Sequence, residues 1–173
     1  MRWSEMQSRQ PRLADRVRQR VVAPGVTLVV TLRNDGTPRL SPVEPLLHDG
    51  GLWLSMMSGS LKARDLVCDP RLLVHGVVTA RDGRDGEVKL RGQARAESDT
   101  AKLESYAAAA AATLGWSPEV GRFHLFEVDI KHVASVRYAE HGDQYLTTWP
   151  PGREVVRRPR PVSGHRSHPV CQP

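Results

Sequence analysis

Residues 26–66 read VTLVVTLRNDGTPRLSPVEPLLHDGGLWLSMMSGSLKARDL, and this stretch decides the fold because it contains three strand signals followed by a helix signal. Apolar residues alternate with other residues over 26–33, and Asp35-Gly36 then forms a short hairpin signal. A second strand is expected over 39–47, and a glycine-rich turn leads into a third strand over 52–57. The stretch therefore predicts antiparallel strands joined by hairpins.

Prolines and helix formers refine this prediction. Pro42 and Pro45 lie inside the second strand, and neither can donate to a sheet ladder, so this strand should be an edge, or bulged, or both. Good helix formers follow over 61–68, and Pro70 ends that helix. A Ser-Gly-Ser loop over 58–60 separates the third strand from this helix.

The rest of the chain continues the same plan. Strand signals are expected over 71–79, 87–96, 123–130 and 133–138, and helices over 11–22 and 99–114. These signals give six to seven mostly antiparallel strands with two or three peripheral helices, which is an α+β class dominated by β structure. Closing the sheet into a small barrel would remove its exposed edges.

Composition divides the chain into three parts. The 173 residues suffice for one core, which we expect to be a barrel domain over 25–140 preceded by a helix and lead-in over 1–24. The extension over 141–173 is rich in arginine and proline. From residue 150 on, five arginines against one glutamate provide +4 of the net charge of +6, so this part is expected to be poorly ordered.

Several classes of protein are excluded or disfavoured by what the sequence lacks. It has no apolar run long enough to cross a membrane and no export signal, so we expect a cytoplasmic protein. Nucleotide-binding and hydrolase motifs of the common kinds are missing. Cys68 and Cys171 do not form a disulfide or zinc pattern, and His165 and His168 lie in the tail without further metal ligands.

The loop and helix over 58–66 could bind a phosphate. A helix N-terminus offers unpaired N–H groups and partial positive charge, and here Ser58 and Ser60 add hydroxyl donors while Lys62 and Arg64 add full charges. The alternative is that Ser60 only caps the helix and that the cations are ordinary surface residues. Local sequence by itself favours this alternative.

The proline-containing strand is a second unusual feature. Because Pro42 and Pro45 lack N–H groups, some polar groups of the neighbouring strand stay free to meet a planar ligand.

Four blocks in order resemble the pyridoxamine 5'-phosphate oxidase-like family of flavin and deazaflavin split-barrel proteins. They are GTPRLSPV at 36–43, DGGLWLS at 49–55, SGSLKARDL at 58–66 and DPR at 69–71. The resemblance implies a split β-barrel, usually a homodimer, with FMN or the deazaflavin coenzyme F420 in a groove between the subunits. It also implies a phosphate group site at Ser58, Ser60, Lys62 and Arg64, and a wall along the ring system made by Ser41, Pro42, Val43, Ser55, Met56 and Met57.

The sequence also departs from the true vitamin B6 oxidases. Residues 52–57 carry no cation, and the arginine-containing substrate motif at the C-terminal end is missing. The Ser-x-Lys arrangement is closer to actinobacterial flavin- and deazaflavin-dependent reductases. We therefore expect an oxidoreductase that transfers hydride between the bound cofactor and a small conjugated substrate, with no catalytic residue assigned.

Two alternatives remain open. One is a non-catalytic split-barrel protein that binds FMN or haem. The other is an interaction module whose basic tail contacts nucleic acid or an acidic partner. The tail lacks the interleaved aromatic residues that stack on bases, which argues against nucleic acid as a partner.

Overall fold

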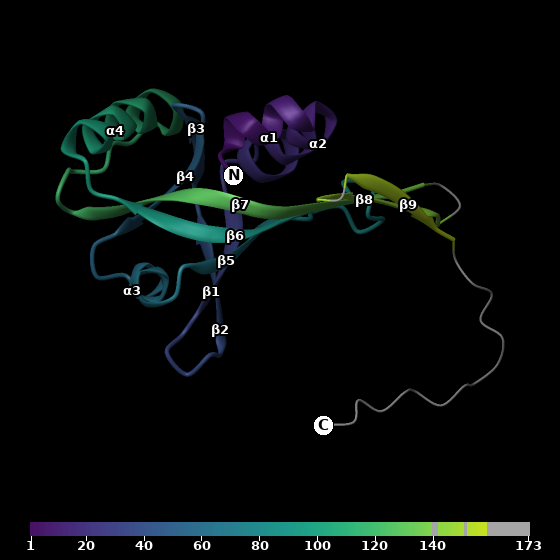
Figure 1. Cartoon of the computed structure of the whole chain (residues 1–173), viewed down its shortest axis with the longest axis horizontal. Helices are drawn as coiled ribbons and strands as arrows, with labels where there is room; N and C mark the ends of the chain where they lie inside the picture. Colours follow the sequence, from purple (N-terminus) through teal and green to yellow (C-terminus); the bar gives the residue numbers. More distant parts are fainter. Residues whose placement is uncertain (140–141, 151, 159–173) are drawn as a thin grey trace.

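The structure is a computed structural model that describes residues 1–139, 142–150 and 152–158. Within these residues, nine strands form one antiparallel sheet with helices on its outside (Figure 1). The strands are β1 (Thr27–Leu32), β2 (Pro38–Val43), β3 (Pro45–His48), β4 (Gly51–Met57), β5 (Arg71–Gly76), β6 (Glu87–Glu97), β7 (Phe123–Tyr138), β8 (Gln144–Trp149) and β9 (Arg153–Arg157). The helical segments are α1 (Trp3–Arg9), α2 (Pro11–Val17), η1 (Arg18–Val22), α3 (Leu61–Cys68) and α4 (Thr100–Leu114). This arrangement is the split-barrel α+β class that the sequence predicts.

The expected second strand is in fact two strands at opposite ends of the sheet. The strand order is β2-β1-β5-β6-β7-β4-β3, and only Glu44 separates β2 from β3 in the chain. Pro42 pairs with Leu28 of β1, and Pro45 pairs with Leu54 of β4. Each proline is thus on an edge strand, where its missing N–H costs no ladder bond. The chain crosses from one edge to the other within one residue, and this closes the sheet.

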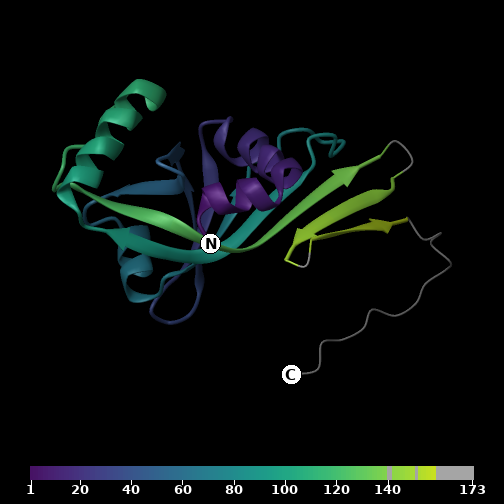
Figure 2. The same cartoon turned by 45° about the horizontal axis from the view of Figure 1, so that its top comes forward.

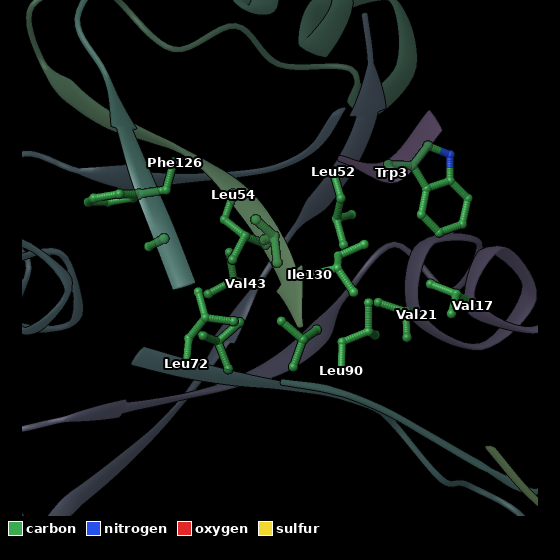
Figure 3. Close-up of a cluster of buried hydrophobic side chains, with 14 of the residues drawn as sticks. Trp3, Val17, Val21, Val43, Leu52, Leu54, Leu72, Leu90, Phe126 and Ile130 are labelled. Atoms are coloured by element: carbon green, nitrogen blue, oxygen red, sulfur yellow. The ribbon is translucent and has the colours of Figure 1, made fainter. Parts of the chain in front are cut away.

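The core fills the inside of this closed sheet (Figure 3). On β4, alternate residues face the core, and the same holds for β6 over its first eight residues. The core side chains from these two strands are Leu52, Leu54, Met56, Val88, Leu90 and Ala94. A smaller apolar cluster lies between α4 and the other face of β4, where Trp53 packs near Tyr106.

The two strands expected over 123–130 and 133–138 form one long strand with a bulge. Arg91 pairs with His132 and Gly92 pairs with Ile130, so Lys131 has no partner residue on β6. A Cβ atom on Gly92 would lie 2.5 Å from the carbonyl oxygen of Asp129. The glycine therefore permits the close approach of the two strands at the bulge.

The N-terminal part contains one more helix than the sequence predicts. The expected helix over 11–22 appears as α2 followed by the π-helical turn η1, whereas α1 was not expected. Trp3 and Met6 of α1 are buried in the core. Both helices lie against one side of the sheet, and α3 lies on the other side (Figure 1).

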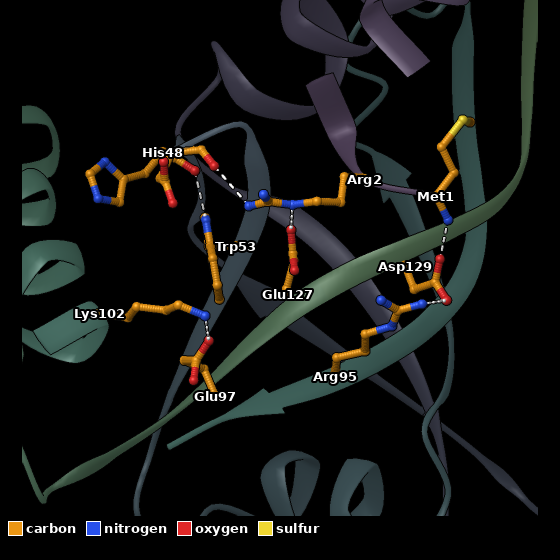
Figure 4. Close-up of polar contacts among 10 residues, drawn as sticks. Met1, Arg2, His48, Trp53, Arg95, Glu97, Lys102, Glu127 and Asp129 are labelled. Atoms are coloured by element: carbon orange, nitrogen blue, oxygen red, sulfur yellow. Dashed lines mark hydrogen bonds and ion pairs between the residues drawn. The ribbon is translucent and has the colours of Figure 1, made fainter. Parts of the chain in front are cut away.

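Charged contacts hold the first residues against β7 and its neighbours (Figure 4). The terminal ammonium of Met1 and the guanidinium of Arg95 both donate to the carboxylate of Asp129, and the second contact is 2.5 Å long. Burial raises the pKa of this carboxyl, but the hydrogen bonds and nearby cations lower it by more. Nε of Arg2 donates to Glu127 at 2.7 Å.

The C-terminal extension differs from expectation where it is described. Strands β8 and β9 form a hairpin that projects away from the barrel (Figure 2), although the chain from residue 150 is expected to be poorly ordered. Val155 and Val156 favour an extended backbone, and Oγ1 of Thr147 donates to Glu154 at 3.1 Å across the hairpin. Residues 159–173, which include Cys171, His165 and His168, lie outside the described residues.

Helices α3 and α4 begin and end where their sequence signals predict. The side chain of Ser60 accepts a hydrogen bond from the Ala63 amide at 3.4 Å, and that of Asp99 accepts one from the Lys102 amide at 3.0 Å. Gly115 ends α4 with φ of 77°. In the described part of the chain, no helix is both long and apolar enough to cross a bilayer.

Candidate anion-binding site

A cavity of about 640 Å³ lies between α3 and the hairpin that joins β1 to β2. One side is formed by residues of α3 and the other by the hairpin. Its lining residues are Arg33, Asn34, Asp35, Arg39, Leu61, Arg64, Asp65, Val67, Cys68 and His124. Three arginines outnumber two aspartates here, so the cavity favours an anion.

The three arginines differ in how they are held. Nη1 of Arg33 donates to the Thr37 hydroxyl at 3.1 Å and to the Pro38 carbonyl at 3.2 Å, which keeps it on the hairpin. Nε of Arg39 donates to Oδ2 of Asp65 at 2.6 Å. Arg64 is exposed, and its side chain makes no hydrogen bond or ion pair with the described residues.

Asp65 is the buried carboxylate of this site. Its side chain accepts from Arg39 and also from the Thr31 hydroxyl at 2.7 Å. Burial raises the pKa of Asp65. The hydrogen bonds from Arg39 and Thr31 and the charges of Arg39 and Arg33 lower this pKa by a larger amount, so the net shift is downward. Asp65 is therefore ionised at neutral pH.

The predicted phosphate residues lie close together but do not share one cavity. Only Arg64 lines the cavity. Nζ of Lys62 donates to the Pro42 carbonyl at 3.0 Å, so its ammonium lies against β2. Ser60 caps α3, and Ser58 is exposed with its amide donating to the Arg122 carbonyl at 3.0 Å.

The residues predicted to form the wall along a planar ring divide into two groups. The side chains of Val43 and Met56 are buried in the core, so these residues can meet a ligand only through their backbone. Met57 is 76% exposed, Pro42 is exposed, and Ser41 and Ser55 are half-buried. Alternation along β4 explains the difference, because Met56 shares the inward face of Leu52.

Tyr106 has a buried hydroxyl group near Ser55, one of the residues predicted to form the wall along the ring. Oη of Tyr106 is buried and makes no hydrogen bond with the described residues, although Ser55 and Glu44 lie nearby. Burial raises the pKa of Tyr106 above its ordinary value. This hydroxyl is therefore protonated at neutral pH.

Of the residues that line the cavity, the sequence predicted only Arg64; those that it missed include Arg33, Arg39, Asp65 and His124. The available signal for Asp65 was its position on α3 between Ala63 and Leu66, both of which are buried. For Arg33 and Arg39 the signal was their placement on either side of the Asp35-Gly36 turn, which brings them to the same end of the hairpin. His124 had no local signal.

A second cavity, of about 610 Å³, lies on the outer face of β1, β5, β6 and β7. Its lining includes the apolar side chains of Val30, Leu32 and Leu73 and cationic residues such as Arg91. Within the described residues, no group of three or more histidine, cysteine, aspartate or glutamate side chains could hold a metal ion.

Comparisons with solved structures support the fold. The chain is similar to a haem-binding protein from Mycobacterium smegmatis, with 23% identity and a TM-score of 0.59, covering 80% of this chain and 59% of that one. It thus spans little more than half the length of that protein. A NimC/NimA family protein from Clostridium acetobutylicum gives 14% identity and a TM-score of 0.61, with 84% and 94% coverage. A protein described as an F420 reductase gives 13% identity and a TM-score of 0.53, with 67% and 94% coverage.

At these identities the structural likeness shows the fold alone. A comparison with curated protein sequences finds no match. The family model described as "Pyridoxamine 5'-phosphate oxidase" matches residues 13–137, which is most of the chain and includes the cavity between α3 and the β1–β2 hairpin. The chain is therefore a member of the pyridoxamine 5'-phosphate oxidase-like family.

Proposed function

We propose that this protein is an oxidoreductase that binds FMN or the deazaflavin coenzyme F420, with the cofactor phosphate in the cavity beside α3. The observation that carries the proposal is the convergence of Arg33, Arg39 and Arg64 on one cavity in a member of this family. Planar guanidinium groups donate paired hydrogen bonds to phosphate oxygens. Lys62, next to the cavity-lining Leu61 on α3, donates to the Pro42 carbonyl of β2 and adds a fourth positive charge.

The residues present fit the cofactor at its phosphate end and at an apolar surface next to it. Leu40, Met57, Leu61 and Val67 are each more than half exposed, and Leu61 and Val67 line the cavity itself. Exposed apolar side chains that line a cavity, as Leu61 and Val67 do, are typical of a surface that is covered by a ligand or a partner. A flavin or deazaflavin ring would supply the hydride chemistry, while this chain binds and orients it.

The same proposal includes a homodimer with the cofactor between its subunits. Leu28, Val30 and Leu32 of β1, with Leu73 of β5, form a half-exposed apolar strip on the outer face of the sheet. A second copy of the chain would cover this strip, and the cations around the second cavity would lie at the border of the interface. We expect a small conjugated molecule as substrate.

Cofactor titration tests the proposal. The absorption spectrum of freshly purified protein shows whether flavin, deazaflavin or haem is retained, because their bands differ. Titration with FMN and with F420, followed by fluorescence, should give a Kd below about 100 μM for at least one of them. Weaker binding of both would overturn the proposal.

A haem-binding function is the second candidate, and His124 favours it. This histidine lines the cavity and could ligate iron, while the neighbouring arginines could pair with carboxylates. A Soret band after addition of haemin, lost in His124→Ala, would support this candidate. No spectral change with haemin would exclude it.

A further inference from the structure

Asp65 connects three elements at the back of the cavity. From α3, its Oδ2 accepts from Nε of Arg39 on β2 at 2.6 Å and from Oγ1 of Thr31 on β1 at 2.7 Å. The Asp65 side chain is 8% exposed, and that of Arg39 is 20% exposed. The carboxylate is thus held from two sides in a place that water hardly reaches.

This contact leaves the outer edge of the Arg39 guanidinium free. Asp65 occupies Nε, whereas Nη1 and Nη2 make no hydrogen bond with the described residues. Because Arg39 lines the cavity, these two nitrogens are available to an anion there. A guanidinium fixed at one edge loses less conformational entropy when its other nitrogens bind a ligand.

Charge by itself would argue for the opposite role. A carboxylate at 2.6 Å from Arg39 lowers the positive potential that attracts a phosphate. Simple electrostatics therefore predicts that removal of Asp65 strengthens anion binding. If Asp65 instead holds the guanidinium in place, its removal weakens binding.

The geometry points to Asp65 as a positioning residue that presents the terminal nitrogens of Arg39 to the phosphate of the bound cofactor. This inference rests on the proposed function. It adds that the site depends on a buried carboxylate as well as on its cations, and that Asp65 acts only through Arg39.

A double-mutant cycle on the full chain tests it, with Kd for FMN and F420 as the measured quantity. Asp65→Ala should weaken binding at least about tenfold, although it makes the cavity more positive. Asp65→Asn keeps an acceptor oxygen for Nε and should recover affinity to within about threefold of the wild type. In an Arg39→Ala background, Asp65→Ala should have no further effect, because the two residues act as one unit.

Thr31→Val is the matched control. It removes the other hydrogen bond to Asp65 and leaves the Arg39 contact in place, so binding should stay unchanged even if stability falls. Where Asp65→Ala does not fold, Arg39→Lys replaces it. A lysine keeps the charge but cannot meet Asp65 and offer two further nitrogens in one plane, so binding should weaken about fivefold or more.

Three results would overturn the inference while the proposed function stands. The first is that the wild type binds a cofactor and Asp65→Ala binds it equally well or more tightly. The second is that Asp65→Ala weakens binding as much in the Arg39→Ala background as in the wild type. The third is that Arg39→Lys binds the cofactor as tightly as the wild type. Failure of the wild-type chain to bind either cofactor would overturn the proposed function and this inference together.

Discussion

Nζ of Lys62, on the first turn of α3, donates a hydrogen bond to the carbonyl oxygen of Pro42 on β2 at 3.0 Å. The contact joins the two segments that the sequence singles out, the Ser-Gly-Ser loop with its helix and the strand with two prolines. It also holds an ammonium against β2, while Leu61 and Arg64 on the same helix line the cavity.

Lys62→Ala is expected to weaken FMN or F420 binding by about 1.5–3 kcal/mol, which is about 10- to 150-fold, because a charged hydrogen-bond donor to phosphate is lost. Fluorescence titration measures the change. The free energy of unfolding should fall by less than about 1.5 kcal/mol, since Lys62 is only half-buried. Arg12→Ala removes an exposed cation from α2 and should leave Kd unchanged, and an unchanged Kd in Lys62→Ala would assign Lys62 a structural role only.

The ionisation of Asp65 should make the free energy of unfolding depend on pH in the acidic range. Because its pKa in the folded state lies below its ordinary value, the ionised carboxylate stabilises the fold at pH values above about 4. That stabilisation is lost as the pH falls below about 4 and through the folded-state pKa.

Asp65→Asn should therefore lower the free energy of unfolding at pH 7 by about 1–3 kcal/mol and flatten its decrease below about pH 4. Urea unfolding at a series of pH values measures both effects. Asp15→Asn, at an exposed position on α2, should leave the profile as in the wild type. Parallel profiles for Asp65→Asn and the wild type would show that Asp65 does not contribute to acid sensitivity.

Gly92→Ala should destabilise the protein by about 1–3 kcal/mol, because the added methyl group meets the Asp129 carbonyl at the bulge. Thermal unfolding measures the loss. Gln93→Ala, at the next and exposed position of β6, should change stability by less than about 0.5 kcal/mol. Equal stability of the two variants would mean that β6 and β7 can move apart at the bulge without cost.

Leu73→Arg should convert the proposed homodimer to a monomer, because it buries a charge at the centre of the apolar strip on β1 and β5. Light scattering after gel filtration measures the mass. Val120→Arg changes an exposed residue in the turn before β7 and should leave the mass unchanged. A wild-type monomer, or a dimer that survives Leu73→Arg, would contradict the interface.

Features set by neighbouring residues could be predicted from the sequence. The start of α3 follows from Ser60 and its end from Pro70, and the position of the first hairpin follows from Asp35-Gly36. The two prolines correctly indicate an edge or an irregular strand. They do not reveal that β2 and β3 lie at opposite edges, because this depends on which distant strands, β1 and β4, pair with them.

In the candidate site as well, contacts between neighbouring residues could be predicted from the sequence and contacts between distant residues could not. Lys62 and Arg64 are two residues apart on one helix, so their proximity could be predicted. The approach of Arg39 to Asp65 joins residues 26 positions apart and requires the hairpin to lie against α3. The family resemblance implies that Met56 belongs to the wall along the ring, whereas its alternation with Leu52 and Leu54 places its side chain in the core.

The crossing of the chain from β2 to β3 at Glu44 determines where the backbone can be cleaved or its termini relocated. Since β2 and β3 are the two edge strands of the sheet and only Glu44 joins them, a chain break at this residue would free the two edges from each other and let the barrel open. New termini for a circular permutant therefore belong at the turn after α4 rather than here, and proteolytic cleavage at Glu44 would let the two edge strands separate and pair with other chains.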